Sequence, residues 1–491
     1  MRALIIDLNN FSRYPTLPIG LIVATLRKAG IEVDVLSPLA RGVKGYPRHP
    51  RDRPWGLIEN RLRYWSAVSP SAVVRRARRL AARAMNPGGS ADRSVVLRYA
   101  IEMLERQLDV VLISAYTMYE DICRAIAGEC RARRVPVVVG GNYFVLPEVV
   151  ERWLRIDGVS VVYGGEPERD LGALLEDLVN GRDVSRYPGV SVPGRHAAPP
   201  APPLQDLDSL PFPDYTDFPW SLYPNRIVPI MAGRGCGWGR CRFCSDVITS
   251  AGRTFRSRSL ENVLGELRYQ RERHDTSLFV FLDLKLNSDL NLWRGLLERL
   301  PCVVPDASWT ASVHVDSGKD NGLFRQDLIQ ARRAGLARVT SGLETASARL
   351  LQRMAKGSSL ARTSEFIRDA AEAGIGVRLT TITGYPGEEP GDIEETTRFL
   401  SQHSRWIDRV VLNMFQLKPG TDLDRRSKLR DSYLPGVRRG PIDTTNAVIQ
   451  FSNTAHDSRA YRRAVYKLME VVHQINRRPL SGDAREFAGV M

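Results

Sequence analysis

The segment GRGCGWGRCRFC, residues 233–244, directly follows the short apolar stretch 227–232. It carries three cysteines within nine positions, Cys236, Cys241 and Cys244, and its glycines let the backbone curve closely around a ligand. Soft thiolate ligands select zinc or an iron-sulfur cluster over hard cations. Because the sequence offers no fourth ligand nearby, one iron of such a cluster keeps an open position. This is the feature that separates a catalytic cluster from a closed structural one.

A second interpretation of the same cysteines is a structural zinc site that a distant residue such as His274 completes. Structural zinc normally takes paired Cys-x2-Cys or Cys/His clamps. The spacing Cys-x4-Cys-x2-Cys has only one such pair, so it favours the iron-sulfur cluster.

Apolar stretches of strand length alternate with helical patterns, such as residues 260–273, on both sides of this loop. Six strand-helix repeats predict an open six-stranded parallel barrel or a doubly wound sheet. The predicted strands are residues 227–232, 278–283, 308–313, 337–342, 376–383 and 409–415.

The first third of the chain has the same strand-helix rhythm and predicts a parallel sheet of its own. Ligands bind beyond the carboxyl ends of such strands. No Gly-x-Gly-x-x-Gly opens the first helix, so a dinucleotide is not expected. A proline-rich stretch, residues 194–224, predicts a stiff extended linker between the two units. The candidate ligand loops are residues 9–20, 114–117, 140–143 and 164–167.

The composition of the 491 residues, 43% apolar and 25% charged, is that of a globular protein and excludes collagen-like, mucin-like and wholly disordered classes. The longest apolar runs, 110–113 and 135–139, are too short to span a bilayer. The first residues predict a strand rather than a signal peptide, so we expect a cytoplasmic protein.

The net charge of +15 is concentrated in residues 41–98, where 14 basic residues face three acidic ones. This segment is either a solvated helix on the domain surface or a docking site for an anionic substrate or an acidic peptide. In the second case Arg75, Arg76, Arg78 and Arg79 would provide the contacts. The segment has no nucleic-acid-binding signature, so a nucleic-acid partner is not expected.

The cysteine motif, with an aromatic residue before its last cysteine, resembles that of radical S-adenosylmethionine (SAM) enzymes. Supporting motifs recur in the family's order: SGLE at 341–344, TGYPGE at 383–388 and KPGT at 418–421. The commonest family spacing, Cys-x3-Cys-x2-Cys, has one residue fewer. The first third resembles the cobalamin-binding domain that precedes this barrel in one subfamily. This likeness rests on LPIGL at 17–21 and on residues 112–114, 138–141 and 163–166.

The resemblance implies that the three cysteines ligate three irons of a 4Fe-4S cluster and that SAM chelates the fourth. Reductive cleavage of SAM, with electrons from an external donor such as flavodoxin or ferredoxin, then gives a 5′-deoxyadenosyl radical. Asp283 and Glu344 suit the ammonium or ribose groups of SAM, although each could equally be a helix N-cap acid. The predicted SAM contacts are Phe243, Asp283, Glu344, Ile382 and Gly384.

In the first domain the resemblance implies a bound cobalamin. The motif Asp-x-His-x-x-Gly is missing, and no such pattern surrounds His49, so the cobalamin should lack a histidine lower ligand. Each predicted contact also suits ordinary strand-end turns. The predicted contacts are Ser114, Tyr116, Thr117, Gly140, Gly141, Asn142, Gly164, Gly165 and Glu166.

We therefore expect an α/β protein with a helical C-terminal extension. The expected function is a cobalamin-dependent radical SAM methyltransferase that acts on an unactivated carbon of a small-molecule or peptide substrate. The alternatives are a cyclase or rearrangement enzyme without methyl transfer, and a non-catalytic corrinoid- or zinc-binding regulator. Lys285, Asn287, His314 and Asn413 could face the substrate. The predicted regions are 1–195 (Rossmann-like, with the insertion 41–98), 196–225 (linker), 226–420 (barrel) and 421–491 (extension).

Overall fold

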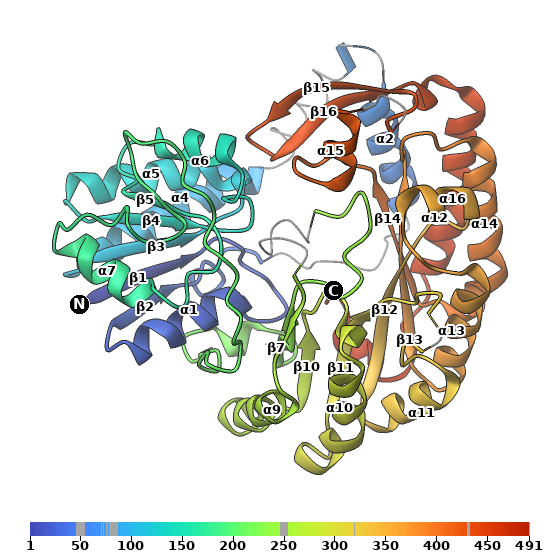
Figure 1. Cartoon of the computed structure of the whole chain (residues 1–491), viewed down its shortest axis with the longest axis horizontal. Coiled ribbons are helices and arrows are strands. Elements are labelled where there is room, and N and C mark those ends of the chain that lie inside the picture. The colour runs from blue at the N-terminus through green and yellow to red at the C-terminus, as the bar shows by residue number, and fades with distance from the viewer. Residues whose placement is uncertain are drawn as a thin grey trace.

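Two α/β units lie side by side in the computed structural model (Figure 1). Arg75, Arg76, Arg78 and Arg79 lie outside the described residues, as does His49. None of the described helices combines the length and the apolar character that crossing a bilayer requires. The structure describes residues 1–45, 55–69, 71, 73, 74, 77, 87–245, 254–318, 320–429 and 433–490.

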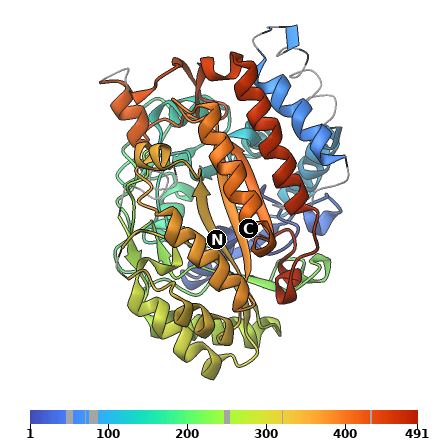
Figure 2. The ribbon, with the colours of Figure 1, turned by 90° about the vertical axis from the view of Figure 1, so that its right-hand side faces the viewer.

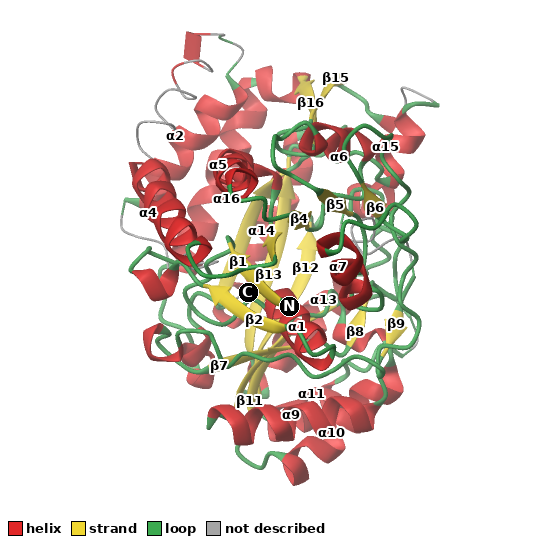
Figure 3. Cartoon of the chain, turned by 90° about the vertical axis from the view of Figure 1, so that its left-hand side faces the viewer, coloured by secondary structure: helices red, strands yellow, loops and turns green. Residues whose placement is uncertain are grey.

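A six-stranded sheet with helices on both faces forms the first unit (Figure 3). Its strands are β1 (Arg2–Asp7), β2 (Glu32–Leu36), β3 (Val110–Ser114), β4 (Val137–Gly140), β5 (Val161–Tyr163) and β6 (Val190–Ser191). Its helices are α1 (Leu17–Lys28), α4 (Pro87–Leu104), α5 (Glu120–Ala132), α6 (Pro147–Leu154) and α7 (Leu171–Val179); α2 (Gly56–Val68) comes from the same part of the sequence but packs on the second unit. The strand order is β2-β1-β3-β4-β5-β6, and all pairs are parallel except β5 with β6. The predicted parallel sheet is confirmed, and β6 is an unpredicted addition.

The second unit is an open sheet of six parallel strands in the order β14-β13-β12-β11-β10-β7, which confirms the predicted barrel strands. Its strands are β7 (Ile227–Ile230), β10 (Leu278–Phe281), β11 (Ser308–Val313), β12 (Leu336–Glu344), β13 (Gly376–Thr383) and β14 (Arg409–Met414). Its helices are α9 (Leu260–His274), α10 (Leu290–Val303), α11 (Arg325–Arg333), α12 (Ala348–Met354), α13 (Leu360–Glu372) and α14 (Pro390–His403).

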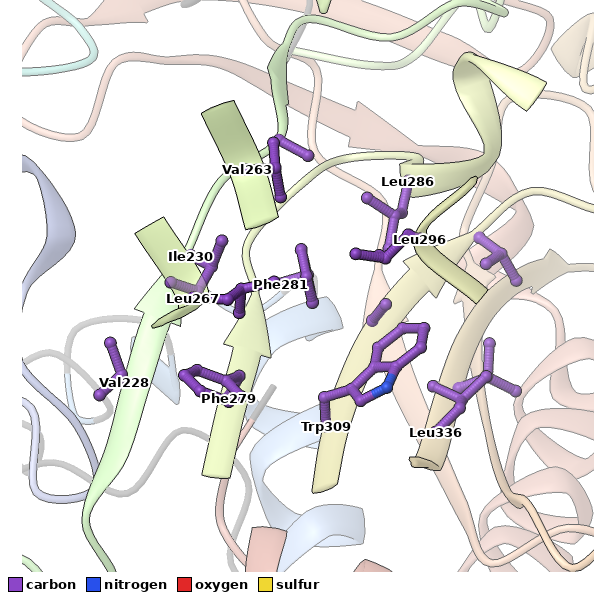
Figure 4. Close-up of a cluster of buried hydrophobic side chains, with 14 of the residues drawn as sticks. Val228, Ile230, Val263, Leu267, Phe279, Phe281, Leu286, Leu296, Trp309 and Leu336 are labelled. Atoms are coloured by element: carbon purple, nitrogen blue, oxygen red, sulfur yellow. The ribbon is translucent and has the colours of Figure 1, made fainter. Parts of the chain in front are cut away.

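Apolar side chains on alternate strand positions fill the space between the barrel sheet and its outer helices. The intervening positions face the inside of the barrel. There Arg338 of β12 donates hydrogen bonds to the carbonyls of Phe487 (2.9 Å) and Val490 (2.9 Å), so the C-terminal residues contact the barrel's interior. Figure 4 shows part of the outer layer, with Val228, Ile230, Val263, Leu267, Phe279, Phe281, Leu286, Leu296, Trp309 and Leu336.

The proline-rich linker is packed between the two units rather than acting as a free spacer. Tyr215 is completely buried, and its hydroxyl donates a hydrogen bond to the carbonyl of Pro229 in β7 (2.9 Å). On the other side Arg27 of α1 forms ion pairs with Asp214 (2.6 Å) and Asp217 (2.6 Å). The linker therefore fixes α1 against the first strand of the barrel.

The C-terminal extension is only partly helical. It contains α15 (Asp422–Ser427) and α16 (Arg459–Asn476), but between them β15 (Val437–Asp443) and β16 (Val448–Asn453) form an antiparallel hairpin. The prediction of a purely helical extension is wrong at this hairpin. The reason is physical: β15 is mostly polar and half-exposed, so it lacks the apolar pattern that marks a buried strand.

Helix α2, from the basic insertion of the first unit, packs against α16 at the far end of the chain (Figure 2). The ring of Tyr64 lies 5.9 Å from that of Tyr466 and 6.1 Å from that of His456. Arg61 forms an ion pair with Glu470. This part of the insertion is therefore a bridge between the two units.

Replacing Gly20 with alanine should destabilise the protein, because a Cβ atom there would overlap the ring of Tyr215. Overpacking of this kind costs about 1–3 kcal/mol in the free energy of unfolding. Gly128→Ala in α5 is the matched control, since no atom lies within 4 Å of its added methyl group. Thermal melting followed by circular dichroism should show a lower Tm for Gly20→Ala only. Equal Tm values for the two variants would contradict the tight linker packing.

Candidate functional site

The loop that carries the cysteines begins at the carboxyl end of β7, where Asp283 holds it. The carboxylate of Asp283 accepts hydrogen bonds from the backbone N–H groups of Ala232 (3.0 Å) and Gly233 (2.7 Å). Burial raises the pKa of Asp283 to about 7 despite these bonds. Asp283 is not a helix N-cap, because α10 is capped by Asp289. Its observed role is to position the start of the cysteine loop.

A short antiparallel pair, β8 (Gly233–Arg234) with β9 (Arg256–Ser257), turns the chain toward the cysteines. Gly235 follows with φ +88°, and a Cβ atom there would overlap the carbonyl of Thr254. Glycine is therefore required immediately before Cys236.

The middle of the loop is fixed against the turn after α12. The indole N–H of Trp238 donates to the carbonyl of Ala355 (3.1 Å), and the backbone N–H of Arg242 donates to that of Met354 (3.0 Å). Gly357 has φ +67°, and a Cβ atom there would overlap the Trp238 ring. The cysteine loop and this turn thus fit each other closely.

The three cysteine side chains are half-buried, and Lys356 is the cation beside them. Burial raises the pKa of the Cys241 thiol, while the nearby Lys356 ammonium opposes that rise. Lys356 also interacts electrostatically with Cys244. The sequence analysis missed Lys356, which brings positive charge to the place where thiolates would form.

The three cysteine thiols are the ligand type that a soft metal centre requires, but their side chains do not converge on one point in this structure. In the described part of the chain, no three His, Cys, Asp or Glu side chains are close enough together to hold a metal ion. The N–H of Cys244 bonds the carbonyl of Cys241 (3.4 Å), so these two residues share one tight turn. The alternative zinc ligand His274 ends α9, where its ring packs 4.5 Å from that of Trp220. The structure therefore offers no support for the zinc interpretation.

Glu344 stands at the carboxyl end of β12, and its carboxylate lies beside the Lys356 ammonium. Its carboxylate bonds the Lys356 ammonium (3.1 Å) and accepts a hydrogen bond from the hydroxyl of Thr380 (3.4 Å). Glu344 has φ +59° at an irregularity in the β12–β13 pairing. A Cβ atom on Gly342 would overlap the Glu344 carboxylate, so the Gly-x-Glu spacing leaves room for the acid.

Phe243 and Ile382 belong to one apolar cluster, in which the ring of Phe243 lies 6.4 Å from that of Tyr385. Two of the predicted SAM contacts are therefore brought together from distant parts of the sequence. Gly384, with φ +83°, follows β13, and its N–H donates to the carboxylate of Glu388 (2.6 Å). Burial raises the pKa of Glu388 to about 7.

The predicted cobalamin loops follow neighbouring strands β3, β4 and β5, so they share one edge of the first sheet. A Cβ atom on Gly141 would overlap the carbonyl of Ala115, and one on Gly164 would overlap that of Phe144. These glycines therefore let the loops pack on one another. Of the polar candidates, Asn142 is exposed and Thr117 is buried at the start of a short 3-10 helix.

This edge faces the barrel. The Lys418 ammonium, in the turn after β14, donates to the hydroxyl of Tyr143 (3.3 Å), and Arg152 of α6 donates to the hydroxyl of Thr444 (3.2 Å). The strand-end loops of the first unit are thus in contact with the segments that follow β14. A molecule held at both edges would lie between the two units.

Glu166 is the centre of a buried charge network between the units. Its carboxylate forms ion pairs with Arg256 (2.8 Å) and Arg234 (3.0 Å) and accepts the N–H of Leu204 (2.9 Å). Arg234 also pairs with Glu168 (2.6 Å). Burial alone would raise the pKa of Glu166, but the bond to Arg256 and the other contacts hold it below its usual range. The sequence analysis assigned Glu166 to cobalamin and missed this interdomain role.

The predicted substrate-facing residues have different surroundings. Lys285 pairs with Asp316 (3.1 Å), and Asn413 is exposed on β14. Asn287 is a structural residue, since its amide bonds both the backbone N–H and the carbonyl of His314 (3.1 Å each). The ring of His314 lies 5.6 Å from that of Trp238, and its Nε2 is buried without a hydrogen-bond partner.

Comparison with known proteins assigns the class. Residues 230–400, which contain the cysteine loop and the four barrel strands β10, β11, β12 and β13, match the model of the radical SAM superfamily. This part of the chain is therefore a radical SAM domain.

Curated relatives match about two thirds of their own length. An uncharacterized methyltransferase of Pyrococcus horikoshii is 28% identical over 325 residues, 64% of this chain and 68% of the relative. Bacteriochlorophyllide d C-12(1)-methyltransferase of Chlorobaculum tepidum is 25% identical over 320 residues, 64% of each chain.

Solved structures share the fold of both units. TsrM from Kitasatospora setae, a radical SAM methyltransferase solved with cobalamin and a 4Fe-4S cluster, covers 96% of this chain and 89% of its own, with TM-score 0.65 and 17% identity. OxsB, a cobalamin-dependent radical SAM enzyme solved with aqua-cobalamin, covers 91% of this chain and 64% of its own, with TM-score 0.66 and 15% identity.

Glu166→Gln should strongly destabilise the protein at neutral pH, because it removes the charged partner of the buried Arg256 and leaves Arg234 with Glu168 alone. Breaking a buried pair in this way costs about 3–5 kcal/mol in the free energy of unfolding. The lowered pKa means that the stabilisation is present above the ordinary glutamate pKa of 4.5 and is lost as the pH falls through the lower value in the folded state. The difference between variant and wild type should therefore shrink at low pH.

Urea unfolding at neutral and acidic pH measures this effect. Glu176→Gln is the control, because Glu176 is an exposed residue of α7. A loss for Glu166→Gln no larger than that of the control would show that the network does not stabilise the fold.

Proposed function

We propose that the chain is a cobalamin-dependent radical SAM methyltransferase that methylates an unactivated carbon of a small-molecule or peptide substrate. The proposal rests mainly on one observation: the barrel matches the radical SAM superfamily, and the likeness to TsrM continues through the first unit to cover 96% of the chain. The curated relatives named as methyltransferases favour methyl transfer as the reaction.

In this proposal Cys236, Cys241 and Cys244 hold the 4Fe-4S cluster. When bound, the cluster and SAM supply a 5′-deoxyadenosyl radical, and cobalamin carries the methyl group. Lys356 balances the negative charge of the thiolates, because its buried ammonium lies beside them. The Glu344 carboxylate would accept a charge-assisted hydrogen bond from the ammonium group of SAM.

In this proposal the other predicted SAM contacts, Phe243, Ile382 and Gly384, lie against the adenine of SAM. The half-buried Phe243 and Ile382 provide apolar surface from one cluster. Gly384 has no side chain beside them, and a Cβ atom there would approach the His456 ring within 3.1 Å. These residues bind and orient SAM and take no part in bond cleavage.

Cobalamin would lie beyond β3, β4 and β5, against the loops that carry Ser114, Tyr116, Thr117, Asn142 and the glycine pairs. The contact between Tyr143 and Lys418 puts these loops opposite the barrel's mouth. In the described residues no histidine lies in these loops, which agrees with a cobalamin that lacks a histidine lower ligand.

A cyclisation or rearrangement reaction is the second candidate. OxsB is a cobalamin-dependent radical SAM enzyme whose TM-score of 0.66 matches the 0.65 of TsrM, so the fold alone does not separate the two reactions. Both reactions require a one-electron donor, for which flavodoxin or ferredoxin remains our prediction.

Anaerobic reconstitution should give a brown protein with about four irons per chain. Cys241→Ala should lose the iron and the absorption of the cluster, because two thiolates cannot replace the third ligand. Cys302→Ala is the matched control, since Cys302 is exposed at the end of α10 and should not affect iron content. Iron analysis and absorption spectra measure the outcome. A colourless protein with one zinc would contradict the proposal.

The full chain should bind cobalamin in the base-off form and should methylate it from SAM under reducing conditions. Methyl-labelled SAM would then give labelled methylcobalamin and S-adenosylhomocysteine, both of which chromatography detects. A cyclase would instead cleave SAM to 5′-deoxyadenosine without labelling the corrinoid. Failure to retain any corrinoid anaerobically would remove the methyltransferase mechanism and leave a radical SAM enzyme of another kind.

A further inference from the structure

The outer edge of β14 has main-chain groups that no other strand covers. β14 is the last strand of the open sheet, so only β13 pairs with it. The N–H of Phe415 bonds the carbonyl of Thr383 (2.8 Å), which directs residue 415 toward β13. Because the direction alternates along a strand, Leu412 and Met414 direct their N–H and C=O groups to the open side.

Asn476 shows how this edge accepts a partner. Its side-chain amide accepts the N–H of Val410 (2.8 Å) and donates to the carbonyl of Val410 (2.8 Å). These are the two bonds that a neighbouring strand would make. Within the described part of the chain, no corresponding contact serves Leu412 or Met414. The amide therefore covers only the first of the three outward-facing residues.

A cavity of about 410 Å³ lies along this edge, within the range of roughly 300–1,000 Å³ that ligand pockets have. Its lining includes residues 409–412 and Met414 of β14, Arg63 and Tyr64 of α2, and Met469, Val472 and Asn476 of α16. The cavity thus follows the length of the strand. The lining also includes Thr383, the last residue of β13, which precedes Gly384.

The lining indicates what the cavity binds. It includes no Asp or Glu, whereas it includes Arg63 of α2 and three arginines of the barrel strands, Arg338, Arg378 and Arg409. Leu412, Met414 and Met469 provide apolar surface. The hydroxyl of Tyr64 is buried without a hydrogen-bond partner. An extended segment with acidic and apolar side chains would satisfy the strand edge, the arginine and the tyrosine together.

We propose that this groove binds an extended acidic peptide segment of the substrate by adding it as a strand to β14. Main-chain hydrogen bonds to Leu412 and Met414 provide the affinity, and the arginines that line the cavity, Arg63 of α2 among them, select acidic side chains. A chain docked along β14 continues past Met414 toward the mouth where the cofactors are proposed to lie. The inference rests on the proposed function only in identifying this peptide as substrate, because binding itself requires no cofactor.

The test uses the full-length chain and a fluorescein-labelled probe peptide, Glu-Val-Glu-Val-Glu-Val. Fluorescence anisotropy should show saturable binding, at least tenfold weaker for the same peptide with N-methyl groups on alternate residues. N-methylation preserves charge and side chains but removes main-chain donors. The probe Lys-Val-Lys-Val-Lys-Val should bind at least tenfold more weakly. Hydrogen exchange at Leu412 and Met414 should slow when the acidic peptide is bound.

Arg63→Gln should weaken binding of the acidic probe severalfold, with Arg93→Gln as the matched control. Arg93 belongs to the same basic segment but pairs with Asp121, outside the cavity lining. Both variants should keep the wild-type Tm, since both arginines are exposed.

Equal binding of the N-methylated peptide would overturn strand addition. Equal losses for Arg63→Gln and Arg93→Gln, or tighter binding of a 20-nucleotide DNA strand than of the peptide, would overturn selection of a peptide by this groove. Peptide binding without cobalamin methylation would contradict the proposed methyltransferase function but support peptide binding at β14. Cobalamin methylation without peptide binding would support the proposed function and contradict peptide binding at β14.

Discussion

The ion pairs of Glu166 with Arg234 and Arg256 are the interaction on which the geometry of the whole molecule depends. Arg234 stands two residues before Cys236, while Glu166 follows β5 of the other unit. The ends of two separate sheets are therefore joined at the root of the cysteine loop. Separating the two units would break these ion pairs, so the network favours the observed contact between them.

The loop between these sheets is held from two further sides. Asp283 fixes its beginning through the backbone, and the turn that ends α12 fixes its middle through Trp238. Such contacts position the backbone that carries the three cysteines, which is what a preorganised site requires.

The sequence predicts most of the framework, because parallel strands buried on both faces are continuous apolar runs. The strand Gly376–Thr383 is predicted with its observed bounds. What the sequence could not predict depends on partners distant along the chain. Arg61 and Glu470 are 409 residues apart, and no local pattern joins them. Lys356 left one weak signal: the chain uses lysine at only eight positions, against 62 arginines.

The bridge formed by α2 also sets an order of events during synthesis. Domains generally fold as the chain emerges, from the N-terminus onward. Helix α2 is made early, but its partner α16 begins only at Arg459. The side of α2 that carries Tyr64 therefore stays exposed to solvent until the ribosome has made α16. Until then the nascent protein carries a surface that attracts chaperones or other nascent chains, and completion of the last long helix is the step that conceals it.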